Sequence, residues 1–111
     1  PIDTGPIRST LPMQKQRFRE IVSQFVRRLD ERFEAMEKAL QQKDADQLVE
    51  LGHWLKGASG NCGFNPIAET ALKLETTSRD ADLESIPAIL RELRDLRARI
   101  EVPDSVQASA T

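Results

Sequence analysis

Apolar side chains recur every three or four residues along the first half of the chain. Between residues 14 and 42 there is neither glycine nor proline. The apolar positions in this stretch are Phe18, Val22, Phe25, Leu29, Phe33, Met36 and Leu40, with Ile21 and Val26 widening the stripe. This spacing is the period of a helix with one apolar face. The pattern therefore predicts one long amphipathic helix.

The remaining apolar positions predict three shorter helices. The second covers about residues 44–62 and stops at Gly63, which suits a helix C-terminus. The third covers about residues 66–78. The fourth begins near residue 82 or 85 and ends before Pro103, because proline cannot continue a helix. Four helices with short connections fold by default as an antiparallel four-helix bundle. No stretch sustains the alternation of a strand, so the expected class is all-α.

The two ends of the chain lack this periodicity. Residues 1–11 hold two prolines and a glycine and are predicted to be a linker or tail. Residues 103–111 are small and polar and are predicted to be a flexible tail. The bundle itself should occupy residues 12–102.

Composition narrows the function classes. The 111 residues include 16 Lys and Arg against 18 Asp and Glu, a net charge of −2, which argues against binding nucleic acid. The sequence contains no run of about 18 apolar residues, so no membrane-spanning helix and no membrane contact are expected. The single His and the single Cys exclude a disulfide, a multi-cysteine zinc site and a histidine-pair metal site. A lone thiol favours the cytoplasm, and no spare apolar stripe demands a dimer, so we expect a cytoplasmic monomer.

The second helix presents its only histidine away from the core. With about 100° between successive residues, the buried stripe of this helix centres on the side opposite His53. That stripe consists of Leu48, Leu51, Leu55, Ala58 and Cys62, so Cys62 is expected to be an inert core thiol. The exposed face around His53 carries Val49, Lys56, Gly57 and Gly60. Trp54 is expected to be half-buried, and Phe64 to pack inward.

Glycines inside this helix are unusual. Gly52, Gly57 and Gly60 each cost about 1 kcal/mol relative to alanine in a helix interior. Core crowding cannot require Gly57 or Gly60, because both lie on the exposed face. One interpretation is that another molecule approaches this face so closely that a Cβ would obstruct it. The alternative is a locally weak helix in which the glycines are tolerated.

His53 has the chemistry of a nucleophile. A neutral imidazole offers a free ring nitrogen near pH 7. Lys56 lies one turn later on the same side, where its ammonium can pair with an anion carried by the ring. No general base is expected beside His53. The alternatives are an idle surface histidine and an acid–base residue of an enzyme, although a helix face opposite the core offers no concave pocket for catalysis.

The segment H-W-L-K-G-A-S-G-N-C-G-F at residues 53–64 resembles the signature of histidine-containing phosphotransfer (HPt) domains, roughly H-x-L-K-G-x-[SAG]-x-x-x-G. The resemblance extends along the chain. Residues 18–22 with Phe25 are similar to the first long helix of that family, and Leu72-x-Leu74-Glu75 is similar to an L-x-L-E element of its third helix.

The resemblance implies a phosphorelay function. Such a domain accepts a phosphoryl group from the aspartyl phosphate of a response-regulator receiver and passes it to another receiver. It has no kinase activity of its own. It also has no cofactor of its own, since the Mg²⁺ that assists the transfer belongs to the receiver. His53 would be the phosphorylated residue, Lys56 would stabilise charge, and Val49, Gly57 and Gly60 would form the docking face. The domain would be either a module of a bacterial hybrid sensor kinase, through which it could be tethered to the inner membrane, or a standalone protein. The alternative is a helical adaptor bundle with no phosphorylated residue.

Overall fold

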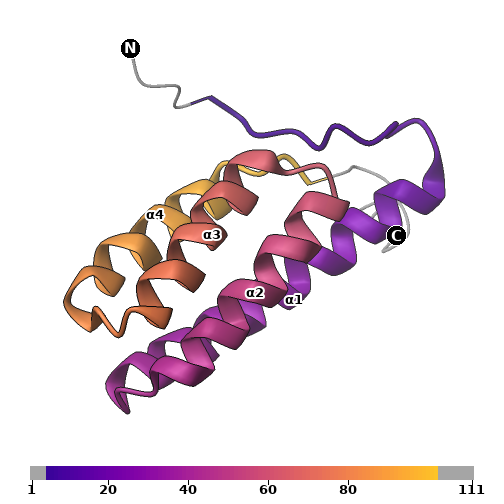
Figure 1. Ribbon diagram of the computed structural model, residues 1–111. Helices are drawn as coiled ribbons and strands as arrows, with labels where there is room; N and C mark the ends of the chain where they lie inside the picture. The colour runs from indigo at the N-terminus through magenta and orange to yellow at the C-terminus, as the bar shows by residue number, and fades with distance from the viewer. Residues whose placement is uncertain (1–4, 103–111) are drawn as a thin grey trace.

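Four helices make up the body of the computed structural model, which describes residues 5–102. They are α1 (Gln16–Gln41), α2 (Ala45–Asn61), α3 (Asn65–Arg79) and α4 (Ile86–Ala98), with a short 3₁₀ turn, η1 (Leu83–Ser85), before α4. Figure 1 shows the chain reversing direction at each connection, so that the helices lie side by side as a bundle. Within residues 5–102 no strand is present. The predicted all-α four-helix bundle is confirmed, and the tail predicted for residues 103–111 lies outside the described residues.

Local signals set the ends of the helices. The side chain of Asp44 accepts a hydrogen bond from the backbone N–H of Gln47 at 3.0 Å and so caps α2. After α2, Gly63 takes a φ of +79°, a left-handed conformation that suits glycine. α4 ends at Ala98, earlier than the position of Pro103 requires, because the residues after it turn aside to pair with Ile7.

The core is built mainly from the predicted stripes. The middle of the α1 stripe, from Val22 to Met36, is buried, and so are the leucines of α2. Ile21, which the apolar stripe included, is 41% exposed, and Leu72 on α3 is 49% exposed. Ile21 stays accessible because it borders a groove between α1 and α2 rather than the packed interior.

The N-terminal strap, residues 5–11, is bound to one end of the bundle. Ile7 donates its N–H to the carbonyl of Arg99 at 2.6 Å and accepts from Glu101 at 2.8 Å. Thr10 donates to the carbonyl of Gly63 at 3.0 Å, and the Ile7 side chain is buried. The expectation of a linker or tail therefore does not describe the contacts of residues 7–10. The apolar periodicity of the sequence could not predict these contacts, because they depend on backbone hydrogen bonds and a single apolar side chain.

Removing residues 1–11 is expected to lower the free energy of unfolding by about 2 kcal/mol, roughly the value of burying one isoleucine. Urea unfolding followed by circular dichroism measures the change. Ile7→Ala should reproduce most of the loss. Arg8→Ala should leave the stability nearly unchanged, because its ion pair with Glu101 is exposed to solvent. An unchanged urea midpoint after the deletion would show that the strap contributes nothing to the fold.

Candidate functional site

His53 projects from α2 into solvent. Its side chain is 71% exposed, while Leu48, Leu51 and Leu55 of the same helix are buried on the opposite side. The orientation therefore agrees with the helical period of the sequence. Trp54, the next residue, is half-buried and stacks on Phe25 of α1, with ring centroids 6.4 Å apart.

A buried carboxylate from α3 holds the His53 ring. The Oε2 atom of Glu75 lies 3.0 Å from Nδ1 of His53, and its Oε1 atom accepts from Nζ of Lys56 at 2.9 Å. Arg79, one turn further along α3, donates to Oε2 at 3.2 Å. The Glu75 side chain is only 5% exposed, so its charge is balanced by these neighbours.

The charge state of Glu75 determines the tautomer of His53. The hydrogen bond from Lys56, the largest effect, lowers the pKa of Glu75; burial opposes this, and the contact with His53 adds to it. A deprotonated carboxylate can only accept hydrogen bonds, so Nδ1 of His53 carries a hydrogen. In the neutral ring the lone pair then lies on Nε2. The nitrogen available to react is therefore Nε2.

Gly52 lets α3 approach α2 closely enough for this contact. A Cβ at Gly52 would lie 2.8 Å from the backbone nitrogen of Glu75 and 3.0 Å from its Cα. Such distances are shorter than carbon atoms tolerate, so a side chain here would force the two helices apart. Gly52 is thus a packing glycine, and it places the backbone of Glu75 directly behind the helix that carries His53.

Gly57 and Gly60 are not required for the packing of α2 against another helix. A Cβ at either position would meet no described atom within 4 Å. Both residues are exposed, and Val49 on the same helix is half-buried. The surface beside His53 is therefore bare backbone, as the sequence pattern suggested, and packing does not explain it.

Comparison with known families agrees with this arrangement. The Hpt domain family model matches residues 20–102, which is most of the chain. The chain belongs to the Hpt domain family. Members of this family take part in histidine phosphotransfer within phosphorelays, as carriers of the phosphoryl group, and their partners are receiver domains. Neither a curated protein nor a solved structure matches the chain.

The sequence interpretation missed Glu75 as a partner of the histidine in this Hpt domain. It expected no side chain at a predictable position beside His53 that could act as a base, whereas a carboxylate contacts Nδ1 directly. The Nζ atom of Lys56, which the sequence places near a phosphoryl group on the ring, also donates a hydrogen bond to this carboxylate. One signal was present: Glu75 follows Leu74 on the buried side of α3, and a buried glutamate requires cationic or donor partners.

Two classes of site find no support in the described part of this Hpt domain. Among residues 5–102, no group of three or more His, Cys, Asp or Glu side chains is placed to hold a metal ion. Within the same range, no helix is both long enough and apolar enough to cross a membrane.

Cys62 is buried, and burial raises the pKa of its thiol, which disfavours the reactive thiolate.

The lowered pKa of Glu75 predicts a pH-dependent contribution to stability. Because the folded value lies below the unfolded value of about 4.3, the unfolded chain binds more protons between the two, and stability falls as pH falls through that window. We expect the unfolding free energies of wild type and Glu75→Gln to converge between pH 5 and pH 3 (roughly the titration range of a carboxyl group). Urea titrations at each pH measure this convergence.

Glu69→Gln is the matched control, because Glu69 is an exposed carboxylate on the same helix. Its difference from wild type should stay nearly constant across these pH values. If Glu75→Gln also kept a constant difference from wild type, the ion pairs of Glu75 would not contribute to the stability of the folded chain.

Proposed function

We propose that this Hpt domain accepts a phosphoryl group on Nε2 of His53 from the aspartyl phosphate of a receiver domain and passes it to the aspartate of another receiver. The observation that carries the proposal is an exposed imidazole whose Nδ1 is bound by a buried carboxylate, so that Nε2 faces solvent. Bare backbone at Gly57 leaves room beside it for a second protein.

The transfer exchanges one bond to phosphorus for another. The Nε2 lone pair attacks phosphorus, an N–P bond forms, and the bond between phosphorus and the aspartyl oxygen breaks. The released carboxylate keeps the electron pair. The hydrogen on Nδ1 remains in its bond to Glu75, whose negative charge stabilises the positive charge that develops on the ring. The reverse steps deliver the phosphoryl group to the next receiver.

Lys56 supplies positive charge next to the ring. One of its three N–H donors is used by Glu75, and its side chain is 38% exposed, which leaves the other donors free to face a phosphoryl group on Nε2. Phosphoryl transfer passes through a loose transition state with charge on the phosphoryl oxygens, so a positioned cation lowers the barrier. Mg²⁺ in the receiver supplies the remaining charge stabilisation.

The docking face consists of Val49, Gly57 and Gly60 around His53. The glycines let a receiver reach the ring, and the half-buried Val49 offers an apolar contact. This domain needs neither kinase activity nor a cofactor of its own, because the activated phosphoryl group arrives with the receiver. We place it as a monomeric, cytoplasmic module of a bacterial hybrid sensor kinase.

Phosphoryl transfer from a receiver tests the proposal. Purified receivers are loaded with labelled acetyl phosphate and Mg²⁺ and then mixed with the domain. The expected result is label on the domain that survives alkali and is lost in acid, as for phosphohistidine. If no receiver transfers label, and phosphoramidate, a small donor that phosphorylates exposed imidazoles, does not label His53, a helical adaptor would be the better description.

A further inference from the structure

The strap contacts the end of the helix that carries the reactive imidazole. The N–H of Thr10 donates to the carbonyl of Gly63 at 3.0 Å, and the hydroxyl of Ser9 donates to the carbonyl of Cys62, the C-cap residue of α2. Figure 1 shows the strap passing along the end of the bundle at which α2 and α4 finish. A helix leaves its last carbonyls without partners inside the helix. The strap therefore supplies donors that the end of α2 itself lacks.

Gly63 fits closely against the strap. A Cβ at Gly63 would lie 2.7 Å from the backbone nitrogen of Thr10 and 2.8 Å from the hydroxyl oxygen of Ser9. The backbone of the strap thus lies directly against the turn that ends α2. This position needs glycine for two reasons, because its φ is +79° and because the strap leaves no room for a side chain.

The α2 end, residues 57–63, has little helix stability of its own. It includes Gly57 and Gly60, and only proline forms a helix less readily than glycine. The last turn of α2 also carries no basic side chain that would interact favourably with the helix dipole. The order of this segment therefore depends on tertiary contacts.

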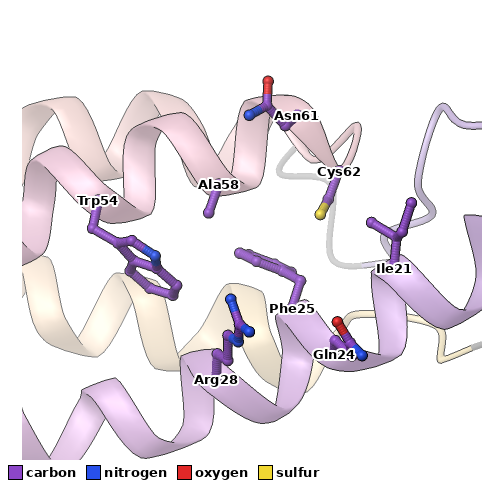
Figure 2. Close-up of a pocket in the computed structure, with 8 residues that line it drawn as sticks. All are labelled: Ile21, Gln24, Phe25, Arg28, Trp54, Ala58, Asn61 and Cys62. Atoms are coloured by element: carbon purple, nitrogen blue, oxygen red, sulfur yellow. The ribbon is translucent and has the colours of Figure 1, made fainter.

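The contacts between the α2 end and α1 are incomplete. Figure 2 shows the side chains of Trp54, Ala58 and Cys62 projecting from α2 towards α1, where Phe25 lies opposite them. These residues line the groove between the two helices, which has a volume of about 210 Å³. Because this space lies on the α1 side, the hydrogen bonds from the strap are an important part of what holds the α2 end.

The strap itself is held by few contacts. Ile7 is the only buried residue among residues 5–11. Its backbone donates to the carbonyl of Arg99 and accepts from the N–H of Glu101. Segments with few buried apolar contacts open at a lower free energy than the whole domain. The strap can therefore detach while the four helices remain folded.

We propose that the strap is a conformational lock on the docking face. While the strap is bound, the α2 end is ordered and a receiver docks on Gly57 and Gly60. When the strap detaches, the α2 end frays and docking weakens. This proposal rests on the proposed function and adds regulation to it, because any event that detaches the strap slows transfer at a given receiver concentration. The apparent Kd for the receiver is the intrinsic Kd divided by the fraction of molecules with an ordered α2 end.

Hydrogen exchange tests the lock without a receiver. In Ile7→Ala, which truncates the buried side chain of the strap, the amides of residues 57–63 are expected to exchange about tenfold faster relative to those of residues 48–55. Ile89→Ala is the matched control, because the two isoleucines are 8% and 9% exposed. Ile89 lies near the beginning of α4, whereas the strap binds beyond its end. In the control, the ratio of exchange rates between the two segments should keep its wild-type value.

Transfer from a receiver tests the consequence of the lock. Ile7→Ala is expected to raise the KM for the receiver about fivefold at unchanged kcat, because only the fraction of molecules competent for docking changes. Ile89→Ala should leave KM at the wild-type value, although it also removes a buried isoleucine side chain. Phosphoramidate, which needs no docking, should label His53 at the wild-type rate in both variants.

Ser9→Ala is a milder second variant, because it removes the side-chain donor to Cys62 and keeps Ile7. It should change the exchange ratio and KM in the same direction by about twofold. Unchanged exchange of residues 57–63 in both strap variants would overturn the lock and leave the proposed function intact. Faster exchange with an unchanged KM would also overturn it, since docking would not depend on the order of the α2 end. Absence of phosphoramidate labelling in the wild-type domain would instead contradict the proposed function.

Discussion

Replacing His53 with glutamine should reduce phosphoryl transfer from a loaded receiver to the background level without the domain. Glutamine keeps a polar side chain that can still donate a hydrogen bond to Glu75, but its amide nitrogen is not a nucleophile. Because His53 is exposed, the substitution should leave helix content and the urea midpoint nearly unchanged. Labelled receiver and gel autoradiography measure the transfer.

Lys56→Ala should slow the transfer without abolishing it, in contrast to His53→Gln. It should accept label on the same nitrogen at a rate lower by about tenfold to a hundredfold, because charge on the phosphoryl oxygens loses one partner. Label that persisted on His53→Gln would contradict the assignment of the phosphorylated residue. Equal rates for Lys56→Ala and wild type would remove Lys56 from the mechanism.

The glycines of α2 should respond in opposite ways to the same substitution. Gly52→Leu is expected to lower the free energy of unfolding by about 3 kcal/mol, because the side chain would have to enter the contact between α2 and α3. Gly57→Leu is expected to raise it by up to about 1 kcal/mol, because the site is open and leucine favours helix. Urea titrations of the two variants measure this difference.

Transfer kinetics complete the comparison. Gly57→Leu should slow transfer from a receiver by at least about tenfold, since a bulky side chain beside His53 obstructs docking (a loss of roughly 1.4 kcal/mol in transition-state stabilisation). Phosphoramidate, which needs no docking, should still label this stable variant. Transfer from the receiver at the wild-type rate would show that the bare backbone at Gly57 is not needed for docking, and the locally weak helix would then explain the glycine.

Contacts between α1 and α4 show a feature that apolar periodicity could not reveal. Arg97 binds Asp30 through two hydrogen bonds of 2.7 and 2.9 Å, and Arg94 lies over the ring of Phe33. These two arginines connect the last helix to the first, because long side chains on a helix surface can reach a neighbouring helix.

The sequence by itself determined the four helices, the core stripe and the outward direction of His53. Each of these follows from the helical period, which is a local property of the chain. It also marked Gly57 and Gly60 as exposed, because helical position alone places them opposite the core. Their role in docking remains a prediction.

Only the tertiary structure decided what surrounds the imidazole. Glu75 lies 22 positions from His53 along the chain, and the two meet because α2 and α3 pack closely at Gly52. The strap at Ile7 and the groove beside Trp54 likewise arise from the packing of segments distant in sequence. The periodicity of one helix fixes which way a side chain points, but the neighbours it meets depend on the distance and rotation between helices.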